Sequence, residues 1–203
     1  MIPKLHYISQ APHLENIEKV CAAGAELVQL RAKHISMNEY MDLAVRAKEI
    51  TEKYNVKFVI NDIPEIAYAV RAYGLHLGKD DMDPKSARKI VGPDCVIGGS
   101  TNCFEDIVMM INLGVDYVGL GPFATTNTKT NLNPILGLEG IKGILQKLKN
   151  FNKAIPVLAI GGIDTKDISD LINAGVYGVA ISSVITNASN QASKITEIKT
   201  ILS

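Results

Sequence analysis

A short polar stretch, residues 119–129, has the composition of a phosphate-binding loop. It reads GLGPFATTNTK and follows an apolar pair, Tyr117 and Val118, that is typical of a buried strand. Its glycines allow close approach of the backbone, its threonines supply hydroxyl groups and Lys129 supplies a positive charge, which together are what a phosphoryl group requires. One such stretch could equally be a polar surface loop. It becomes informative because nearly every other apolar run in the chain ends in residues of the same kinds.

Eight short apolar runs alternate along the chain with longer segments in which apolar residues recur at helical spacing. The runs comprise residues 4–8, 27–30, 57–60, 75–77, 96–97, 118–120, 157–160 and 178–181. They are continuously apolar rather than alternating, as expected of strands that are covered on both faces. Eight right-handed strand–helix–strand units close into a (β/α)8 TIM barrel, for which about 200 residues suffice. The sequence therefore predicts an α/β fold, one barrel domain over residues 1–203, with an open doubly wound sheet as the alternative.

The composition excludes several classes of function. The formal net charge is zero and 47% of the residues are hydrophobic, so neither nucleic acid nor a lipid surface is expected as the main partner. No apolar run approaches the roughly 18 residues of a membrane span, and the residues MIPKLHYIS lack the pattern of a signal peptide. Cys21, Cys95 and Cys103 have no metal-ligand spacing and indicate free thiols in a cytoplasmic protein. The sequence is compatible with a homodimer but does not determine the oligomeric state.

Charged, amide and hydroxyl residues follow the predicted strands, where a TIM barrel carries its active site. In chain order they are Gln29, Arg31, Lys33, Asn61, Asp62, His76, Gly78, Lys79, Asp80, Asp81, Ser100, Gly161, Gly162, Ser182 and Ser183. Each has a simpler interpretation. Asp62 could cap the helix that begins at Pro64, and Asp80 and Asp81 could play the same role before Pro84. Likewise, His76 could be a satisfied histidine at the barrel rim, and Lys79 could be solvated. Their joint occurrence on one rim favours a binding site instead.

These residues divide into two kinds of anion site. Glycines and serines after the seventh and eighth strands suit a phosphate held by backbone amides, at a place where TIM barrels frequently bind one. Arg31, Lys33 and Lys129, together with Asp62 and Asp81, indicate a more highly charged anion. Because carboxylates repel a phosphate unless a hard cation lies between them, the two aspartates predict Mg²⁺ bound to a diphosphate. The residues thus predict two phosphorylated ligands, one of them bound with a metal ion.

The motifs of the chain resemble those of thiamine phosphate synthases in order and spacing, over essentially the whole sequence. The motifs are VQLRAK, IND, LHLGKDD, IGGS, GLGPF with TNTK, AIGGI and GVAISSVI. The resemblance implies a (β/α)8 barrel enzyme, a transferase that joins hydroxymethylpyrimidine diphosphate to hydroxyethylthiazole phosphate in the presence of Mg²⁺. It also implies a dissociative substitution, in which diphosphate leaves before the thiazole nitrogen captures a pyrimidine-methyl cation.

The resemblance further implies a role for each matching residue. The magnesium ligands are expected to be Asp62 and Asp81. The catalytic groups that stabilise the departing diphosphate are expected to be Arg31, Lys33 and Lys129, with Asn61 as a further donor. The pyrimidine contacts are expected to be Gln29 and Ser100. The contacts of the thiazole phosphate are expected to be Thr126, Thr128, Gly162, Ser182 and Ser183.

Three positions depart from the usual pattern of the family: Asn102 stands for histidine, Thr125 for proline and Lys79 for glutamine. A thiazole tautomerase of the same superfamily is the nearest alternative, but that branch lacks the paired carboxylates and depends on a histidine near position 102. A non-catalytic phosphate-binding barrel would not require the charged residues that follow the second to fourth strands. A phosphosugar epimerase would require an acid–base pair that these motifs do not resemble. The synthase is therefore the favoured interpretation.

Overall fold

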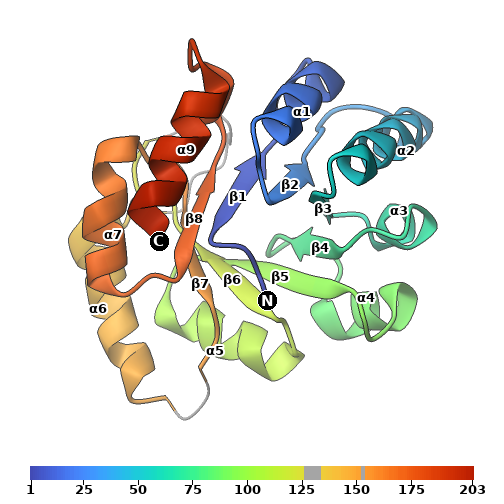
Figure 1. The fold of residues 1–203 in the computed structure, drawn as a ribbon. Helices are drawn as coiled ribbons and strands as arrows, with labels where there is room; N and C mark the ends of the chain where they lie inside the picture. The colour runs from blue at the N-terminus through green and yellow to red at the C-terminus, as the bar shows by residue number, and fades with distance from the viewer. Residues whose placement is uncertain (126–133, 152–153) are drawn as a thin grey trace.

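The computed structural model describes residues 1–125, 134–151 and 154–203 and contains a closed barrel of eight parallel strands. The strands are β1 (Leu5–Ile8), β2 (Leu27–Leu30), β3 (Lys57–Asn61), β4 (Gly74–Leu77), β5 (Val96–Thr101), β6 (Tyr117–Leu120), β7 (Val157–Ile160) and β8 (Gly178–Ile181). Each strand pairs in parallel with the next, and β8 pairs with β1 to close the barrel (Figure 1). The predicted (β/α)8 architecture is confirmed.

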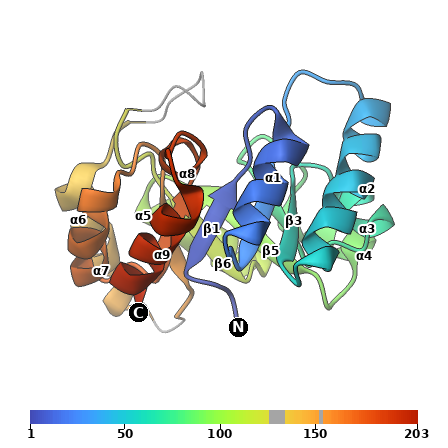
Figure 2. The ribbon, with the colours of Figure 1, turned by 45° about the horizontal axis from the view of Figure 1, so that its top comes forward.

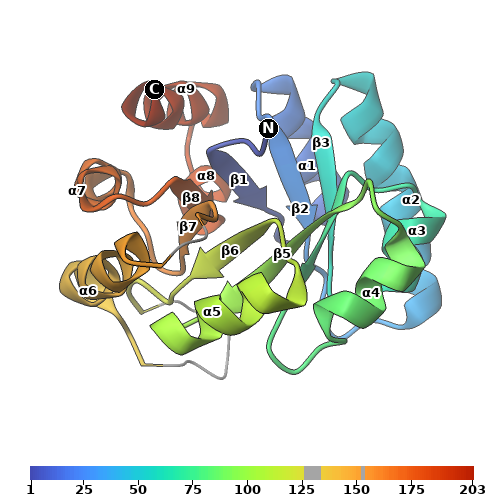
Figure 3. The same cartoon turned by 90° about the horizontal axis from the view of Figure 1, so that it is seen from below.

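Helices form an outer ring around the strands (Figure 1). They are α1 (His13–Ala22), α2 (Met37–Lys53), α3 (Pro64–Ala69), α4 (Pro84–Val91), α5 (Phe104–Leu113), α6 (Gly137–Lys149), α7 (Ile168–Ala174), α8 (Ser183–Thr186) and α9 (Gln191–Leu202), with the 3-10 turn η1 (Thr165–Asp167) before α7. A view from below shows α4, α5, α6, α7 and α9 arranged around the strands (Figure 3). The sequence predicted one helix after the last strand, but the short helix α8 precedes α9 there. The sequence did not predict α8 because its four residues are too few to show a helical period.

Both chain termini lie at the lower end of the barrel in Figure 2, where β1 begins. The carboxyl ends of the parallel strands therefore all lie at the other end. None of the helices in the described part of the chain combines the length and the apolar character needed to cross a membrane.

Successive side chains of each strand point alternately toward the helices and into the barrel. Val28, Leu30 and Ile60 are fully buried in the apolar layer between the strands and the helices. The alternate positions of the same strands carry polar side chains, since Gln29 is 3% exposed and Asn61 is 6% exposed. The inside of the barrel is thus partly polar toward the carboxyl ends of the strands.

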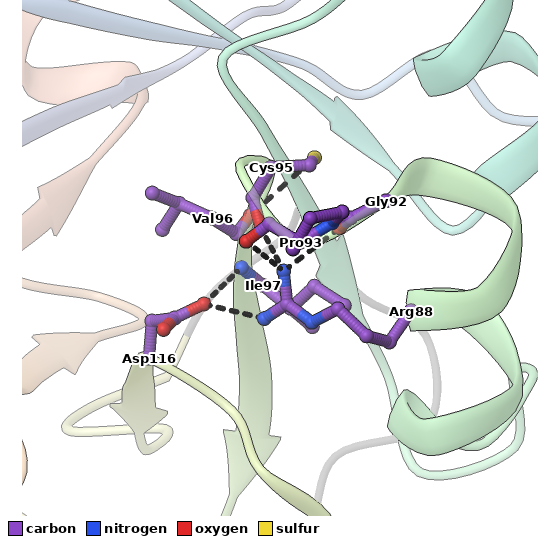
Figure 4. A network of polar contacts seen from close by, with 7 residues as sticks. All are labelled: Arg88, Gly92, Pro93, Cys95, Val96, Ile97 and Asp116. Carbon is purple, nitrogen blue, oxygen red and sulfur yellow. Dashed lines mark hydrogen bonds and ion pairs between the residues drawn. The ribbon is translucent and has the colours of Figure 1, made fainter.

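A polar network joins α4 to the strands at the opposite, N-terminal end of the barrel (Figure 4). The Arg88 guanidinium donates to the carbonyl oxygens of Gly92 and Cys95, and its Nη2 lies 2.7 Å from Asp116 Oδ2. The same carboxylate oxygen accepts a hydrogen bond from the Ile97 amide at 2.8 Å. Because Cys95 precedes β5 and Asp116 precedes β6, these contacts fix the starts of two neighbouring strands.

Candidate active site at the carboxyl ends of the strands

A cavity of about 680 Å³ opens at the carboxyl ends of the strands. The predicted site residues that line it are Gln29, Arg31, Lys33, Asn61, Asp62, Asp81, Ser100, Gly162, Ser182 and Ser183. The barrel therefore brings together predicted site residues from six different strand ends or the loops that follow them, as the prediction from sequence required. Thr126, Thr128 and Lys129 lie outside the described residues, so their roles stay predictions.

The two aspartates do not serve as helix caps. The residue that precedes α3 is Ile63, and no side chain caps that helix. The cap of α4 is Asp83, whose Oδ1 accepts hydrogen bonds from the amides of Lys85 and Ser86 at 3.1 Å. The simpler interpretation of Asp62 and Asp81, which the sequence left open, is therefore excluded.

Asp62 has an unusual backbone conformation that directs its side chain into the cavity. Its φ is 70°, and the Ile63 amide donates to the Asn61 carbonyl oxygen across it at 3.0 Å. This is a three-residue γ-turn of the rarer, strained form. The Asp62 amide also donates to the His76 carbonyl oxygen at 2.8 Å, which ties the turn to β4. Strain of this kind at a residue other than glycine is typical of functional sites.

The carboxylates of Asp62 and Asp81 lie close enough to influence each other. Burial, and then the neighbouring Asp62, raise the pKa of Asp81 to about 6, although the Gly78 amide and Lys33 act in the opposite direction. The Gly78 amide donates to Asp81 Oδ2 at 2.6 Å, and Lys33 forms an ion pair with Asp62. Two carboxylates in this arrangement favour a cation between them. Within the described residues no cluster of three or more His, Cys, Asp or Glu could hold a metal ion, so further ligands would have to come from substrate or water.

The ends of β2 and β3 are held together beneath the cavity. The Tyr40 hydroxyl, from α2, donates to the carbonyl oxygens of Leu30 at 2.7 Å and Asn61 at 3.3 Å. The Arg31 amide donates to Ser9 Oγ at 3.3 Å, which connects β2 to the segment after β1. These hydrogen bonds fix the backbone at Arg31 and Asn61, and therefore the positions from which their side chains extend into the cavity.

The opposite side of the cavity is built from tight turns after β7 and β8. Gly161 and Gly162 have φ values of 88° and 71°, which strongly favour glycine. The Ala124 amide donates to the Gly161 carbonyl oxygen at 2.9 Å, so the turn after β7 contacts the segment after β6. Ser182 Oγ donates to the Ile8 carbonyl oxygen at 2.6 Å, and Ser183 is the first residue of α8. A short extra helix after the last strand is a common part of phosphate sites in TIM barrels.

Two further residues, one in the cavity wall and one close to it in the chain, make contacts that were not predicted. Lys79 is not simply solvated, because its Nζ lies 2.5 Å from Asp106 Oδ2, a carboxylate whose side chain is only 14% exposed. The expectation of a solvated lysine is therefore wrong. Asn102 Nδ2 donates to the carbonyl oxygens of Gly121 at 2.9 Å and Pro134 at 3.0 Å. Neither contact had a signal in the sequence, since both partners are distant along the chain.

The profile of the thiamine monophosphate synthase family matches residues 3–185. This chain belongs to that family. It is 44% identical over 192 residues to the thiamine-phosphate synthase of Flavobacterium johnsoniae, an alignment that covers 93% of this chain and 91% of that protein. It is 39% identical over 202 residues to the thiamine-phosphate synthase of Flavobacterium psychrophilum, and 98% of each chain is covered.

A solved structure agrees with this membership of the thiamine monophosphate synthase family. The thiamine phosphate pyrophosphorylase of Pyrococcus furiosus superimposes with a TM-score of 0.84 at 28% identity, covering 98% of this chain and 95% of that one. The predictions of the family, of the barrel and of a thiamine phosphate synthase, a transferase, are confirmed. The roles of individual site residues stay predictions.

Proposed function

We propose that this chain joins hydroxymethylpyrimidine diphosphate to hydroxyethylthiazole phosphate, with the cavity at the strand ends as its active site. The single observation that carries this proposal is the pair Asp62 and Asp81, which lies beside Lys33 in the same cavity as the glycine and serine turns. A barrel that bound only one phosphate would need the turns alone. The aspartates and the cations add a second, more highly charged anion site.

We propose that Mg²⁺ is the resident metal ion and that Asp62 and Asp81 hold it. The donor set fits, because Mg²⁺ is usually bound by one or two carboxylates together with substrate phosphates and water. The raised pKa of Asp81 also fits, since a cation would relieve the repulsion between the two carboxylates. When bound, the ion would supply positive charge that offsets the charge of the diphosphate.

The chain's own cations would hold the other oxygens of the diphosphate. Arg31, Lys33 and Asn61 all line the cavity next to the aspartates. Arginine suits this task because its planar guanidinium can donate two parallel hydrogen bonds to one phosphoryl group. Lys33 pairs with Asp62 in the structure, and its ammonium group would contact phosphoryl oxygens of the bound diphosphate. From the family resemblance, Lys129 is assigned to the same anion.

The thiazole phosphate is assigned to the opposite side of the cavity, at Gly162, Ser182 and Ser183. Backbone amides of two tight turns and of the first turn of α8 suit a phosphate that carries two negative charges. Thr126 and Thr128 are assigned to it as further hydroxyl donors. The two heterocycles are assigned to the space between these anion sites, where Gln29 and Ser100 line the wall.

The reaction requires charge stabilisation and alignment rather than a nucleophilic residue. The bond between the pyrimidine methylene carbon and the diphosphate oxygen breaks first, and the leaving diphosphate takes the electron pair. The lone pair of the thiazole nitrogen then forms the new bond to that carbon. Arg31 and Lys33 favour the first step because they stabilise the charge that develops on the leaving group, and loss of such a donor costs roughly 3–4 kcal/mol of barrier. Holding both rings in line lowers the entropic cost of the second step.

An assay with both phosphorylated precursors, with Mg²⁺ and with a chelator, tests the proposal. We expect thiamine phosphate and diphosphate in equal amounts, and only with the metal ion. Asp62→Asn should abolish this activity, whereas Asp80→Asn, in the loop that also carries Asp81, should retain it. If folded protein forms no thiamine phosphate from both precursors in the presence of Mg²⁺, the proposal is refuted.

We propose the cytoplasm as the compartment of the protein. Its three cysteines are free, as expected in a reducing compartment.

A further inference from the structure

A chain of buried polar side chains leads from the interior of the barrel to the cavity. His76, on β4, is 5% exposed, and its Nδ1 lies 3.1 Å from the Tyr117 hydroxyl oxygen. Its Nε2 lies 3.0 Å from Ser100 Oγ, and Ser100 lines the cavity. Each ring nitrogen of His76 thus has a polar partner, and one of those partners lines the cavity.

Tyr117 determines which of these nitrogens carries a proton. Tyr117 is 2% exposed, and among the described residues His76 is the hydrogen-bond partner of its hydroxyl. Burial raises the pKa of Tyr117, so the hydroxyl keeps its proton. A buried O–H without an acceptor is costly, so this proton points at His76 Nδ1. The proton of the neutral imidazole then resides on Nε2, which donates to Ser100 Oγ.

The surrounding residues hold the Tyr117 ring in one place. A Cβ added to Gly98 would lie 2.1 Å from Tyr117 Cζ and 2.5 Å from its hydroxyl oxygen, so glycine is required there. The ring of His6 packs edge-to-face against Tyr117, with centroids 5.1 Å apart and an interplanar angle of 75°. The packing therefore leaves the hydroxyl of Tyr117 little choice of partner.

We propose that His76 is a positioning residue that sets the direction of the Ser100 hydroxyl group. Because Ser100 Oγ accepts from His76 Nε2, its own proton is available to an acceptor in the cavity. The ligand group that it fits is a heteroaromatic ring nitrogen with a lone pair, as in an aminopyrimidine. This inference deepens the proposed function and rests on it for the identity of the ring, but the proton on His76 Nε2 is independent of the reaction.

Nuclear magnetic resonance tests the position of the proton directly. Long-range proton–nitrogen correlation spectra of the full chain, labelled with nitrogen-15 at histidine, report which ring nitrogen is protonated, and His76→Asn identifies the His76 signals. We expect the proton on Nε2 in the ligand-free protein, and loss of this preference in Tyr117→Phe. A proton on Nδ1, or on both nitrogens, overturns the inference. Because this measurement needs no substrate, its failure is distinguishable from a failure of the proposed function.

A matched pair of variants tests the effect on catalysis. The amide nitrogen of glutamine can take the place of Nε2, whereas that of asparagine corresponds to Nδ1 and does not reach Ser100. We expect His76→Asn to lower kcat/KM for the pyrimidine diphosphate on the order of tenfold, with the KM for thiazole phosphate unchanged, and His76→Gln to restore most of it. In a Ser100→Ala background the two variants should be equally active, because the coupling acts through that hydroxyl. If the losses in kcat/KM from His76→Asn and from Ser100→Ala simply multiply in the double variant, the inference is overturned. Thermal unfolding identifies any variant that fails to fold.

Discussion

Asp81→Asn in the metal-free protein tests the carboxylate pair of the cavity. Burial, and then the neighbouring Asp62, raise the pKa of Asp81 from 3.8 to about 6, so its charged form is disfavoured in the folded chain. Asparagine keeps the shape of the side chain and an acceptor oxygen for the Gly78 amide, but it carries no charge. The substitution should therefore stabilise the metal-free fold while it removes a proposed magnesium ligand.

The size of the effect follows from the shift in pKa. A change from 3.8 to about 6 corresponds to about 3 kcal/mol. Asp81 is only partly buried, so solvent screening reduces this to about 1–2 kcal/mol. Because the folded pKa lies above the unfolded one, the stability that Asp81 contributes is present below about pH 4 and is lost as the pH rises through about 6. The advantage of Asp81→Asn should therefore grow over this range, to about 2–8 °C in the unfolding midpoint.

Urea denaturation at several pH values, with a chelator and at constant ionic strength, measures this difference. Asp80→Asn is the matched control, because it removes one negative charge from the same loop. Added Mg²⁺ should then stabilise the wild type and Asp80→Asn but not Asp81→Asn, since a ligand stabilises only the state that binds it. If Asp81→Asn is no more stable than Asp80→Asn at pH 8 without metal, the carboxylates of Asp62 and Asp81 do not repel each other in the folded chain.

Three further predictions concern other parts of the barrel. Arg88→Ala should lower the free energy of unfolding in urea by about 2 kcal/mol with turnover unchanged, because it removes a charged donor from Asp116 and from the part-buried carbonyl oxygen of Cys95, at the end of the barrel opposite the cavity. Gly162→Ala should raise the KM for thiazole phosphate on the order of tenfold in steady-state kinetics, since its Cβ would lie 2.6 Å from the Ala124 carbonyl oxygen. Burial lowers the pKa of His6 to about 3, so stability is lost as the pH falls from about 6.5 toward 3, and His6→Phe should flatten this dependence in urea denaturation.

Each of these predictions has a control within the same chain. Arg46→Ala removes an exposed ion pair of 3.5 Å and should cost only about 0.5 kcal/mol, so an equal loss in Arg88→Ala would contradict the first prediction. Gly143→Ala, where an added Cβ meets nothing within 4 Å, should leave the KM unchanged. An unaltered KM in Gly162→Ala would count against the thiazole phosphate site. If the free energy of unfolding of His6→Phe depends on pH as steeply as that of the wild type, groups other than His6 take up the protons.

The sequence predicted which residues reach the cavity more completely than it predicted what they do there. From the sequence, Asp62 and Asp81 could each be a helix cap or a metal ligand, because a carboxylate a few residues before a helix suits both roles. The structure assigns the cap of α4 to Asp83 and leaves α3 without a side-chain cap. Asp83 thus caps a helix, whereas Asp81, only two residues earlier in the chain, lines the cavity.

Lys79 and His76 were harder to interpret, because their partners come from other strands and helices. Lys79 was expected to be solvated, but it pairs with Asp106 on α5. His76 was expected to be satisfied at the rim, and its partners, Tyr117 and Ser100, lie on β6 and β5. No local pattern connects such residues, so neither pair had a signal in the sequence.

The sequence by itself determined the barrel and the chemical inventory of its rim. Apolar runs and helical spacing are local properties, and the residue that follows a parallel strand must lie at the carboxyl end of the sheet. Only the tertiary structure decided that Asp62 and Asp81 share one charge-sensitive site and that Tyr117 orients His76. The reason is physical: a pKa and the direction of a hydrogen bond depend on burial and on neighbours from other strands, which exist only once the barrel has closed.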